Sequence, residues 1–242
     1  MKFYESISEY YDKIFPLKRQ AVNFVNSNLQ HYDKCKVIDI GCATGHMDAA
    51  IASNNVKVEG IDLDKEMIAY ANDKYNSENV SFHVMNMLSI DEEFQLDSFD
   101  IVTCFGNTLV HLVNEEEVYT ALDKMKKVLK KHGKLLIQIL NYQYILDECI
   151  KELPLIENEH IKFERFYSEQ VRDERLIFET RLTIKKTGEI ISNEIYLYPL
   201  LKDQLEKSLK KLGFSNIHFY SNFNKEPYTY NHLPLVVEAV LD

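Results

Sequence analysis

Between residues 35 and 142, short apolar runs alternate with amphipathic helical patterns, and this alternation constrains the fold more than any other feature. Strand-length runs separated by helices indicate a parallel sheet with helices on both faces. The sequence therefore predicts an α/β, three-layer, Rossmann-like sheet. Gly133 is expected to cap the C-terminus of the helix that precedes it. The expected strands are Lys36–Ile40, Val56–Ile61, Val80–Val84, Asp100–Phe105 and Lys134–Leu140, and the expected helices are His46–Ser53, Lys65–Tyr75 and Glu115–Lys130.

Two further segments flank or interrupt this core, which we place at residues 35–145. Residues 1–34 have helical spacing that Pro16 interrupts, so we expect two short helices as an N-terminal cover. Residues 155–199 alternate apolar with polar side chains, which predicts an inserted antiparallel β meander covering the substrate. Residues 200–242 complete the sheet, and a single domain spans residues 1–242. The expected elements are strands at Phe163–Tyr167, Arg175–Lys185 and Ile190–Tyr198, a helix at Leu200–Leu212, and strands at Asn216–Tyr220 and Leu233–Leu241.

The charge balance excludes several classes of partner. The chain has 28 Lys and Arg against 38 Asp and Glu, so its formal net charge is 28 − 38 = −10. This charge repels phosphate backbones and anionic lipids, so we expect neither a nucleic acid nor a membrane partner. The four cysteines form no C-x-x-C pair and share no metal-like spacing with histidines, so no metal site is expected. The N-terminus lacks a signal-peptide pattern, and we expect a cytoplasmic protein.

A tight loop follows the first predicted strand, with the spacing Asp39-x-Gly41-x-Ala43-x-Gly45. Small residues allow a ligand to press against the backbone at the carboxyl end of a parallel strand. The dinucleotide pattern G-x-G-x-x-G does not fit, because the third small residue comes one place early. An acid two residues before the first glycine would repel a pyrophosphate, so the loop suits a ligand with a positively charged end.

This spacing resembles motif I of the class I S-adenosylmethionine-dependent methyltransferases, and the resemblance continues along the chain. Asp62 lies 62 − 39 = 23 residues after Asp39, where an acid meets a ribose in such sheets. Asn86 stands where many family members have an aspartate that contacts adenine. The resemblance implies S-adenosylmethionine as cofactor, with N-terminal helices closing over it and Arg19 reaching its carboxylate. The expected cofactor-binding residues are Tyr11, Arg19, Asp39, Gly41, Cys42, Ala43, Asp62, Leu63, Met67, Asn86, Met87 and Phe105.

Two later segments are similar to the glycine/sarcosine N-methyltransferase branch of this family. They are Cys104-Phe-Gly-Asn107 with the following His111-Leu, and Asn141-Tyr142 after the fifth strand. The resemblance implies a seven-stranded sheet with an antiparallel last strand, and methyl transfer to nitrogen or oxygen of a small molecule. The residues expected to orient the acceptor are Asn107, His111, Asn141, Tyr142 and Tyr196. Of these, His111 could also accept a proton.

One departure bears on the acceptor. Glycine-specific members hold the amino-acid carboxylate with an arginine just ahead of a Tyr-Pro element, whereas this chain reads Ser192-Asn-Glu-Ile-Tyr-Leu-Tyr-Pro199 there. Glycine is therefore not predicted as the substrate. Four arginines of the meander could replace the missing one, namely Arg165, Arg172, Arg175 and Arg181.

Two other functions remain open from sequence. A nicotinamide-dependent oxidoreductase uses a related sheet, although the spacing of the loop and Asp39 disfavour it. A cofactor-binding regulatory protein without catalytic activity would carry the same cofactor motifs. The sequence is compatible with either a monomer or a homodimer.

Overall fold

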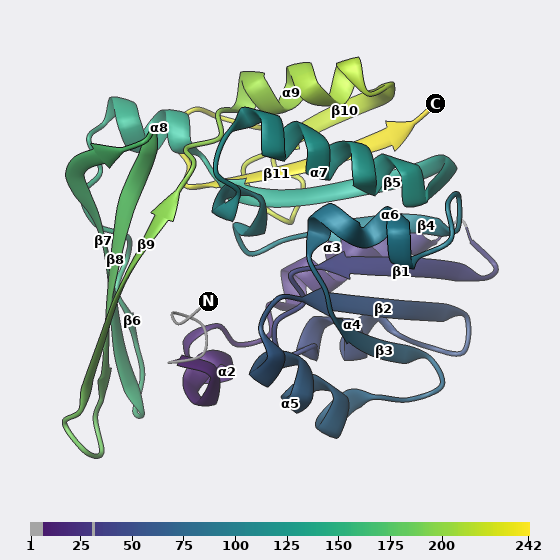
Figure 1. Ribbon diagram of the computed structural model, residues 1–242. Helices are drawn as coiled ribbons and strands as arrows, with labels where there is room; N and C mark the ends of the chain where they lie inside the picture. Colours follow the sequence, from purple (N-terminus) through teal and green to yellow (C-terminus); the bar gives the residue numbers. More distant parts are fainter. Residues whose placement is uncertain (1–6, 31) are drawn as a thin grey trace.

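Two separate sheets organise the protein (Figure 1). The computed structural model describes residues 7–30 and 32–242, except for the side chains of residues 169–171. The predicted N-terminal cover thus includes residues 1–6 and 31, which lie outside the described residues. The helices are α2 (Tyr11–Ile14), α3 (Arg19–Leu29), α4 (His46–Ile51), α5 (Lys65–Tyr75), α6 (Ile90–Glu93), α7 (Glu115–Val128), α8 (Tyr142–Asp147) and α9 (Lys202–Lys211), with short 3-10 helices η1 (Ser8–Tyr10), η2 (Met87–Ser89) and η3 (Thr108–His111).

The larger sheet has seven strands in the order β10-β11-β5-β4-β1-β2-β3. Strands β1 to β5 pair in parallel, whereas β11 is antiparallel to both of its neighbours. The predicted seven-stranded sheet with an antiparallel last strand is confirmed. Its strands are β1 (Cys35–Ile40), β2 (Val56–Asp62), β3 (Val80–Val84), β4 (Phe99–Cys104), β5 (Leu129–Leu140), β10 (Phe214–Tyr220) and β11 (Pro234–Leu241).

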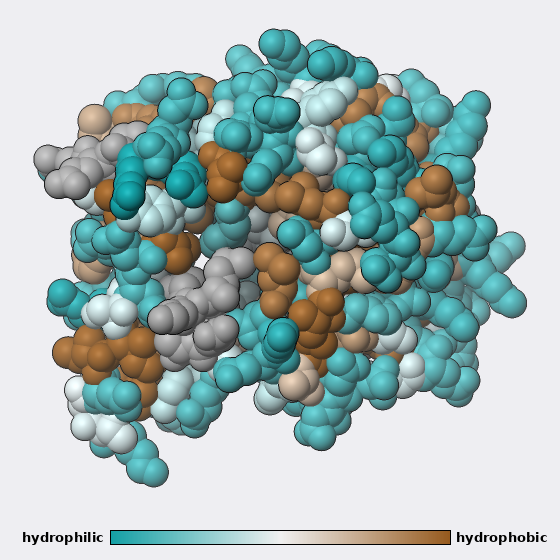
Figure 2. All heavy atoms as spheres, in the orientation of Figure 1, coloured by the Kyte–Doolittle hydropathy of each residue, from teal (hydrophilic) through white to brown (hydrophobic). Residues whose placement is uncertain are grey.

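Helices cover both faces of this sheet, as the continuous apolar runs predict. On one face, Val37 of β1 packs in a cluster with Phe24 of α3. On the other face, Ile38 packs in a cluster with Leu122 of α7 and Leu205 of α9. The outer surfaces of the helices carry mostly hydrophilic side chains on the face in view (Figure 2), in keeping with the high charge content.

The prediction that Gly133 caps a helix was wrong. Helix α7 ends at Val128, and β5 begins at the next residue, so Gly133 lies within the strand. The first residues of β5 bulge, because Phe99 pairs with Leu129 while Ile101 pairs with Lys134. A Cβ atom at Gly133 would lie 2.8 Å from the carbonyl oxygen of Lys130, so the bulge requires a residue without a side chain.

The smaller sheet is the inserted meander, and it packs against the N-terminal segment. Its four antiparallel strands follow the order β6-β7-β8-β9. Ile7 and Ile14 share an apolar cluster with Ile161 and Phe163. In Figure 1, α2 lies between this sheet and the larger one. The strands are β6 (Ile156–Glu157), β7 (Ile161–Arg172), β8 (Arg175–Ile184) and β9 (Ile190–Leu197).

The loop after β1 packs tightly against the segment after β4. Gly41 has φ +78°, and a Cβ atom there would lie 2.5 Å from Thr108 Oγ1 and 2.6 Å from its Cγ2. Strand order reverses between β1 and β4, and ligands of open α/β sheets bind at such a point. Gly41 therefore brings two loops together where a ligand is expected.

We predict that Gly41→Ala lowers the free energy of unfolding. The left-handed backbone costs an alanine about 1–2 kcal/mol, and the overlap with Thr108 adds about 1–3 kcal/mol. Urea denaturation of both single variants and the Gly41→Ala/Thr108→Ala double variant measures the coupling. The double variant should regain the part of the free energy of unfolding that the overlap with Thr108 costs. A Gly41→Ala protein with wild-type stability would contradict the tight packing.

Candidate functional site

Two adjoining cavities lie at the carboxyl edge of the larger sheet, each of about 260 Å³. The first cavity is bounded by the ends of β1, β2 and β3 and by the loops that follow them. The second lies between the sheet edge, the N-terminal segment and the meander. Both are lined by Tyr11, Gly41, Ala43, Phe105, Gly106 and His111. These shared residues mark a junction at which ligands in the two cavities would meet.

Asp62 fixes the loop after β1 at the wall of the first cavity. One carboxylate oxygen accepts a hydrogen bond from the Ala43 N–H at 3.0 Å, and the other accepts one from the Asp64 N–H at 2.9 Å. Burial raises the pKa of Asp62, and these two hydrogen bonds oppose the rise. Each oxygen keeps a lone pair, so the carboxylate can still accept hydroxyl donors from a ligand.

Two buried carboxyl groups lie beneath the same loop. Asp39 accepts a hydrogen bond from Thr103 Oγ1 at 2.5 Å and lines the second cavity. Asp48 of α4 is fully buried, and its carboxyl group lies within hydrogen-bonding reach of the Asp39 carboxyl group. Burial raises the pKa of both groups, and the charge of Asp39 raises that of Asp48 further. Asp48 is therefore the group held neutral, which leaves Asp39 to carry charge toward a cationic ligand.

The other wall of the first cavity is mainly apolar. Leu63 is 45% exposed and Met67 is buried, and both line it together with Met87. The Asn86 side-chain oxygen accepts a hydrogen bond from the Leu88 N–H at 3.0 Å, which begins η2. This contact uses one lone pair of the oxygen expected to contact adenine and leaves the other available.

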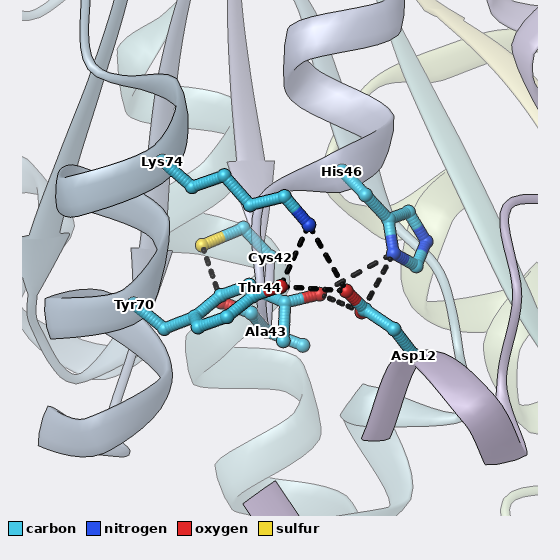
Figure 3. A network of polar contacts seen from close by, with 7 residues as sticks. All are labelled: Asp12, Cys42, Ala43, Thr44, His46, Tyr70 and Lys74. Carbon is cyan, nitrogen blue, oxygen red and sulfur yellow. Dashed lines mark hydrogen bonds and ion pairs between the residues drawn. The ribbon is translucent and has the colours of Figure 1, made fainter. Parts of the chain in front are cut away.

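Figure 3 shows a polar network that fastens α2 to this site. Asp12 accepts a hydrogen bond from Thr44 Oγ1 at 2.6 Å, and His46 Nδ1 lies 3.1 Å from the same oxygen. The other carboxylate oxygen accepts a hydrogen bond from Tyr70 Oη at 3.3 Å and lies 3.8 Å from Lys74 Nζ. Burial would raise the pKa of Asp12, but the His46 and Thr44 hydrogen bonds lower it to about 2.

The network explains how Tyr11 reaches both cavities. Tyr11 is the first residue of α2, directly before Asp12, and it lines the junction. Sequence reasoning placed Tyr11 at the site but missed Asp12, because its partners come from α4, α5 and the loop after β1. Thr108 and Glu117 of the first cavity were also missed. Short motifs around single strand ends carry no signal for such contacts.

Among the residues expected to orient the acceptor, Asn107 and His111 line the second cavity. Asn107 Nδ2 donates a hydrogen bond to Tyr142 Oη at 2.8 Å, and its oxygen accepts one from the Leu140 N–H at 2.9 Å. Asn107 therefore joins the ends of β4 and β5. Burial lowers the pKa of His111 to about 4, so this imidazole at the junction is neutral at pH 7.

Asn141 and Tyr142 do not line either cavity. The Asn141 side chain accepts a hydrogen bond from the Tyr144 N–H at the start of α8 and donates one to the Tyr230 carbonyl oxygen at 2.7 Å. Tyr142 is fully buried, and burial raises its pKa. Tyr142 supports the cavity wall through its hydrogen bond with Asn107, whereas Asn141 joins the start of α8 to the segment at Tyr230.

Tyr196 and Arg19 also lie away from the cavities. Successive strand side chains point to opposite faces, so Ile195 and Leu197 line the second cavity while Tyr196 does not. Arg19 is exposed at the start of α3, and its neighbour Lys18 lines the second cavity instead. Lys18 directly precedes α3 and Arg19 is its first residue, and the helical spacing of the sequence does not show which of the two lines a cavity.

Comparisons with known proteins agree with this geometry. The sequence profile of a methyltransferase domain family matches residues 31–212. A glycine/sarcosine N-methyltransferase of Aphanothece halophytica is 25% identical over 207 residues, which cover 84% of this chain and 74% of that protein. A protein of Geobacillus sp. (strain WCH70) is 29% identical over 163 residues, and the match spans 64% of its length.

The crystal structure of an S-adenosylmethionine-dependent methyltransferase from Clostridium acetobutylicum has the same fold, with a TM-score of 0.81, 15% identity and coverage of 98% of both chains. The chain belongs to the class I S-adenosylmethionine-dependent methyltransferases. The sequence prediction of this family and of its cofactor is thereby confirmed. Within the part of the methyltransferase that the structure describes, none of the helices is both long and apolar enough to span a bilayer.

We predict that Asp12→Asn weakens binding of S-adenosylhomocysteine, the demethylated cofactor, by about 10-fold. The loss of charge-assisted hydrogen bonds frees α2 and Tyr11, which costs about 1.4 kcal/mol of the closed arrangement. Titration calorimetry measures the affinity, with Asp33→Asn as the control because Asp33 is an exposed acid outside the network. Equal affinities of the two variants would contradict a role for Asp12.

The same variant tests the pH dependence of stability. The pKa of Asp12 is lowered in the folded protein, so its contribution is present above the ordinary carboxyl pKa near ~4 and is lost as pH falls toward 2. Urea denaturation should show wild type more stable than Asp12→Asn by about 1–2 kcal/mol at pH 7, after allowance for solvent screening. The difference should shrink between about pH 5 and pH 2. A difference that is constant across this range would assign the effect to packing.

Proposed function

We propose that this methyltransferase transfers the methyl group of S-adenosylmethionine to a nitrogen or oxygen atom of a small molecule. The observation that carries the proposal is the second cavity, which adjoins the first at Tyr11, Gly106 and His111 and has a volume of about 260 Å³. Relatives with small-molecule names support it, including the glycine/sarcosine enzyme and a ubiquinone biosynthesis O-methyltransferase of Photobacterium profundum that is 26% identical over 162 residues.

The donor groups of the first cavity fit the adenosine part of the cofactor. Asp62 offers carboxylate lone pairs to the ribose hydroxyls, and Leu63 and Met67 offer apolar surface to the adenine ring. Asn86 lies at the adenine edge. The cofactor supplies a methyl group that its sulfonium charge already activates, so the protein must mainly align the reactants and exclude water.

The methionine end of the cofactor fits the part of the second cavity nearest the loop after β1. Asp39 would pair with the cofactor ammonium group there, and Gly41 and Cys42 would provide the backbone beside it. Lys18, which lines the cavity where Arg19 was expected, would pair with the cofactor carboxylate. Phe105 and Tyr11 close the junction around the reacting atoms.

His111 and Asn107 serve the acceptor half of the site. His111 is neutral at pH 7 because burial lowers its pKa, so it can accept the acceptor's proton or orient its nucleophilic atom. Asn107 positions the cavity wall through Leu140 and Tyr142. An amine that arrives neutral needs no strong base, which suits His111, because its low pKa makes it a weak base.

Transfer of label from methyl-tritiated S-adenosylmethionine into the low-molecular-mass fraction of a metabolite extract tests the function. Label in that fraction supports the proposal. Label found only in macromolecules, or no transfer by protein that binds S-adenosylhomocysteine, would contradict it and favour a regulatory protein. Enhancement of NADH fluorescence on mixing would revive the oxidoreductase reading.

We predict that Asp62→Ala weakens S-adenosylhomocysteine binding by about 10- to 100-fold. Removing the carboxylate eliminates hydrogen bonds worth about 1.5–3 kcal/mol and releases the loop at Ala43. Asp73→Ala is the matched control, because Asp73 is an exposed acid on α5 outside both cavities. An unchanged dissociation constant in Asp62→Ala would remove this residue from the site.

We predict that the rate of methyl transfer falls at low pH with an acid limb near pH 4, set by His111. The pKa of His111 is lowered in the folded protein, so its proton-accepting form is present throughout pH 6–8 and is lost as pH falls through 4. Rates of label transfer from pH 4 to pH 8 measure the limb. His111→Gln should lower the rate and abolish the limb, and a limb that persists in the variant belongs to another group.

A further inference from the structure

Arg165 of β7 lines the second cavity, and it also lines a third cavity that Leu153 and Pro154 border. The other three arginines considered from sequence do not line either cavity. Arg172 donates a hydrogen bond to Tyr196 Oη at 3.3 Å, and Arg175 lies 5.2 Å from the centre of the Tyr196 ring. Arg181 is exposed on β8. The structure thus separates Arg165 from the rest by its position.

The guanidinium of Arg165 is held in place but is not neutralised. Its Nη2 donates a hydrogen bond to the Pro154 carbonyl oxygen at 2.6 Å, and the group lies 5.9 Å from the centre of the Phe163 ring. Its Nε is buried without a hydrogen-bond partner, and within the described residues no carboxylate forms an ion pair with it. Nε itself has no accessible surface, but the positive charge of the guanidinium is unbalanced, and its remaining Nη donors can pair with an anionic ligand.

The two cavities differ in the sign of the charged side chains that line them. Among the described residues that line the first cavity, the charged side chains are Asp62, Asp64 and Glu117. The second cavity has Lys18 and Arg165 facing one carboxylate, Asp39. Burial lowers the pKa of both basic groups, and Arg165 lowers the pKa of Lys18 further through repulsion. A protein with a net charge of −10 therefore concentrates unneutralised positive charge in its acceptor cavity.

We propose that Arg165 binds a carboxylate group of the methyl acceptor. The inference rests on the proposed function, because it names the class of molecule that the second cavity takes. A planar guanidinium pairs with a planar carboxylate through parallel N–H donors, and one negative charge balances one cation. Lys18 would then bind the carboxylate of the cofactor, so that each of the two cations pairs with one anionic group.

The rest of the wall beside Arg165 defines the body of the acceptor. Phe163, Phe178, Ile195 and Leu197 all line the second cavity. Such a wall favours an apolar chain or ring, and carboxylate binding at Arg165 would leave the opposite end of the acceptor to reach His111 at the junction. The acceptor is thus an amine or hydroxyl compound with an apolar body and a carboxylate at its far end.

Calorimetric titration of the S-adenosylhomocysteine complex with matched probes tests this proposal. The probes are acetate, phenylacetate and 3-phenylpropionate, each compared with its neutral amide. We expect at least one carboxylate to bind about 10- to 100-fold more tightly than its amide in wild type and in Arg181→Gln, with the preference lost in Arg165→Gln. Binding of none of the three carboxylates, equal binding of acid and amide, or a preference that survives Arg165→Gln overturns the proposal.

Further variants separate a folding defect and a cofactor role from acceptor binding. Arg165→Lys keeps the charge and should retain part of the carboxylate preference, which would exclude misfolding as the cause in Arg165→Gln. Arg165→Gln should bind S-adenosylhomocysteine within about 2-fold of wild type. Weaker binding of S-adenosylhomocysteine, with unchanged binding of 5′-methylthioadenosine, would instead assign Arg165 to the cofactor carboxylate; we expect that pattern for Lys18→Met. Failure of wild type to bind S-adenosylhomocysteine would count against the proposed function itself.

Discussion

The site depends on the carboxylate of Asp62, which ties the loop after β1 to the end of β2. Its two oxygens accept backbone hydrogen bonds from Ala43 and Asp64, so one side chain fixes two loops that belong to different strands. Gly41, in the same loop, lies so close to Thr108 that no side chain fits between them. The ends of β1, β2 and β4 are therefore locked together, and the first cavity takes its shape from this contact. Packing of the remaining elements secures the sheet behind it.

The two cavities differ in how they are built, and this difference has a physical consequence. The first is formed by loops that leave neighbouring parallel strands, whose spacing the sheet hydrogen bonds fix. The second needs three parts that are far apart in the chain: the N-terminal segment, the sheet edge and the meander. Apolar contacts of Ile7 and Ile14 with Phe163 hold two of those parts together. The first cavity thus rests mainly on the sheet, while the second depends on how the covering segments pack.

The two cavities also differ in how far the sequence could predict them. The parallel sheet and the cofactor loop rest on local patterns, namely strand-length apolar runs and the spacing from Asp39 to Gly45, and the structure has both. The positions of Tyr196 and Arg19 depend on which way a strand or a helix start faces, and a shift of one residue moves a side chain out of the cavity. Gly133 was assigned to a helix end because a glycine after lysines is typical there, yet a bulge in β5 required it. Asp12 gave no local signal, since all of its partners lie more than thirty residues away.

The network at Asp12 links the two halves of the site. Asp12 contacts Thr44 and His46 beside the cofactor loop, while Ile14, two residues later on the same short helix, packs with the meander. A four-residue helix has too few internal hydrogen bonds to be stable alone, so α2 exists only where both contacts hold it. Tyr11 lines the junction only when this helix is docked. Docking of α2 therefore shapes the junction and the second cavity together, and a substitution on either side of α2 should affect both.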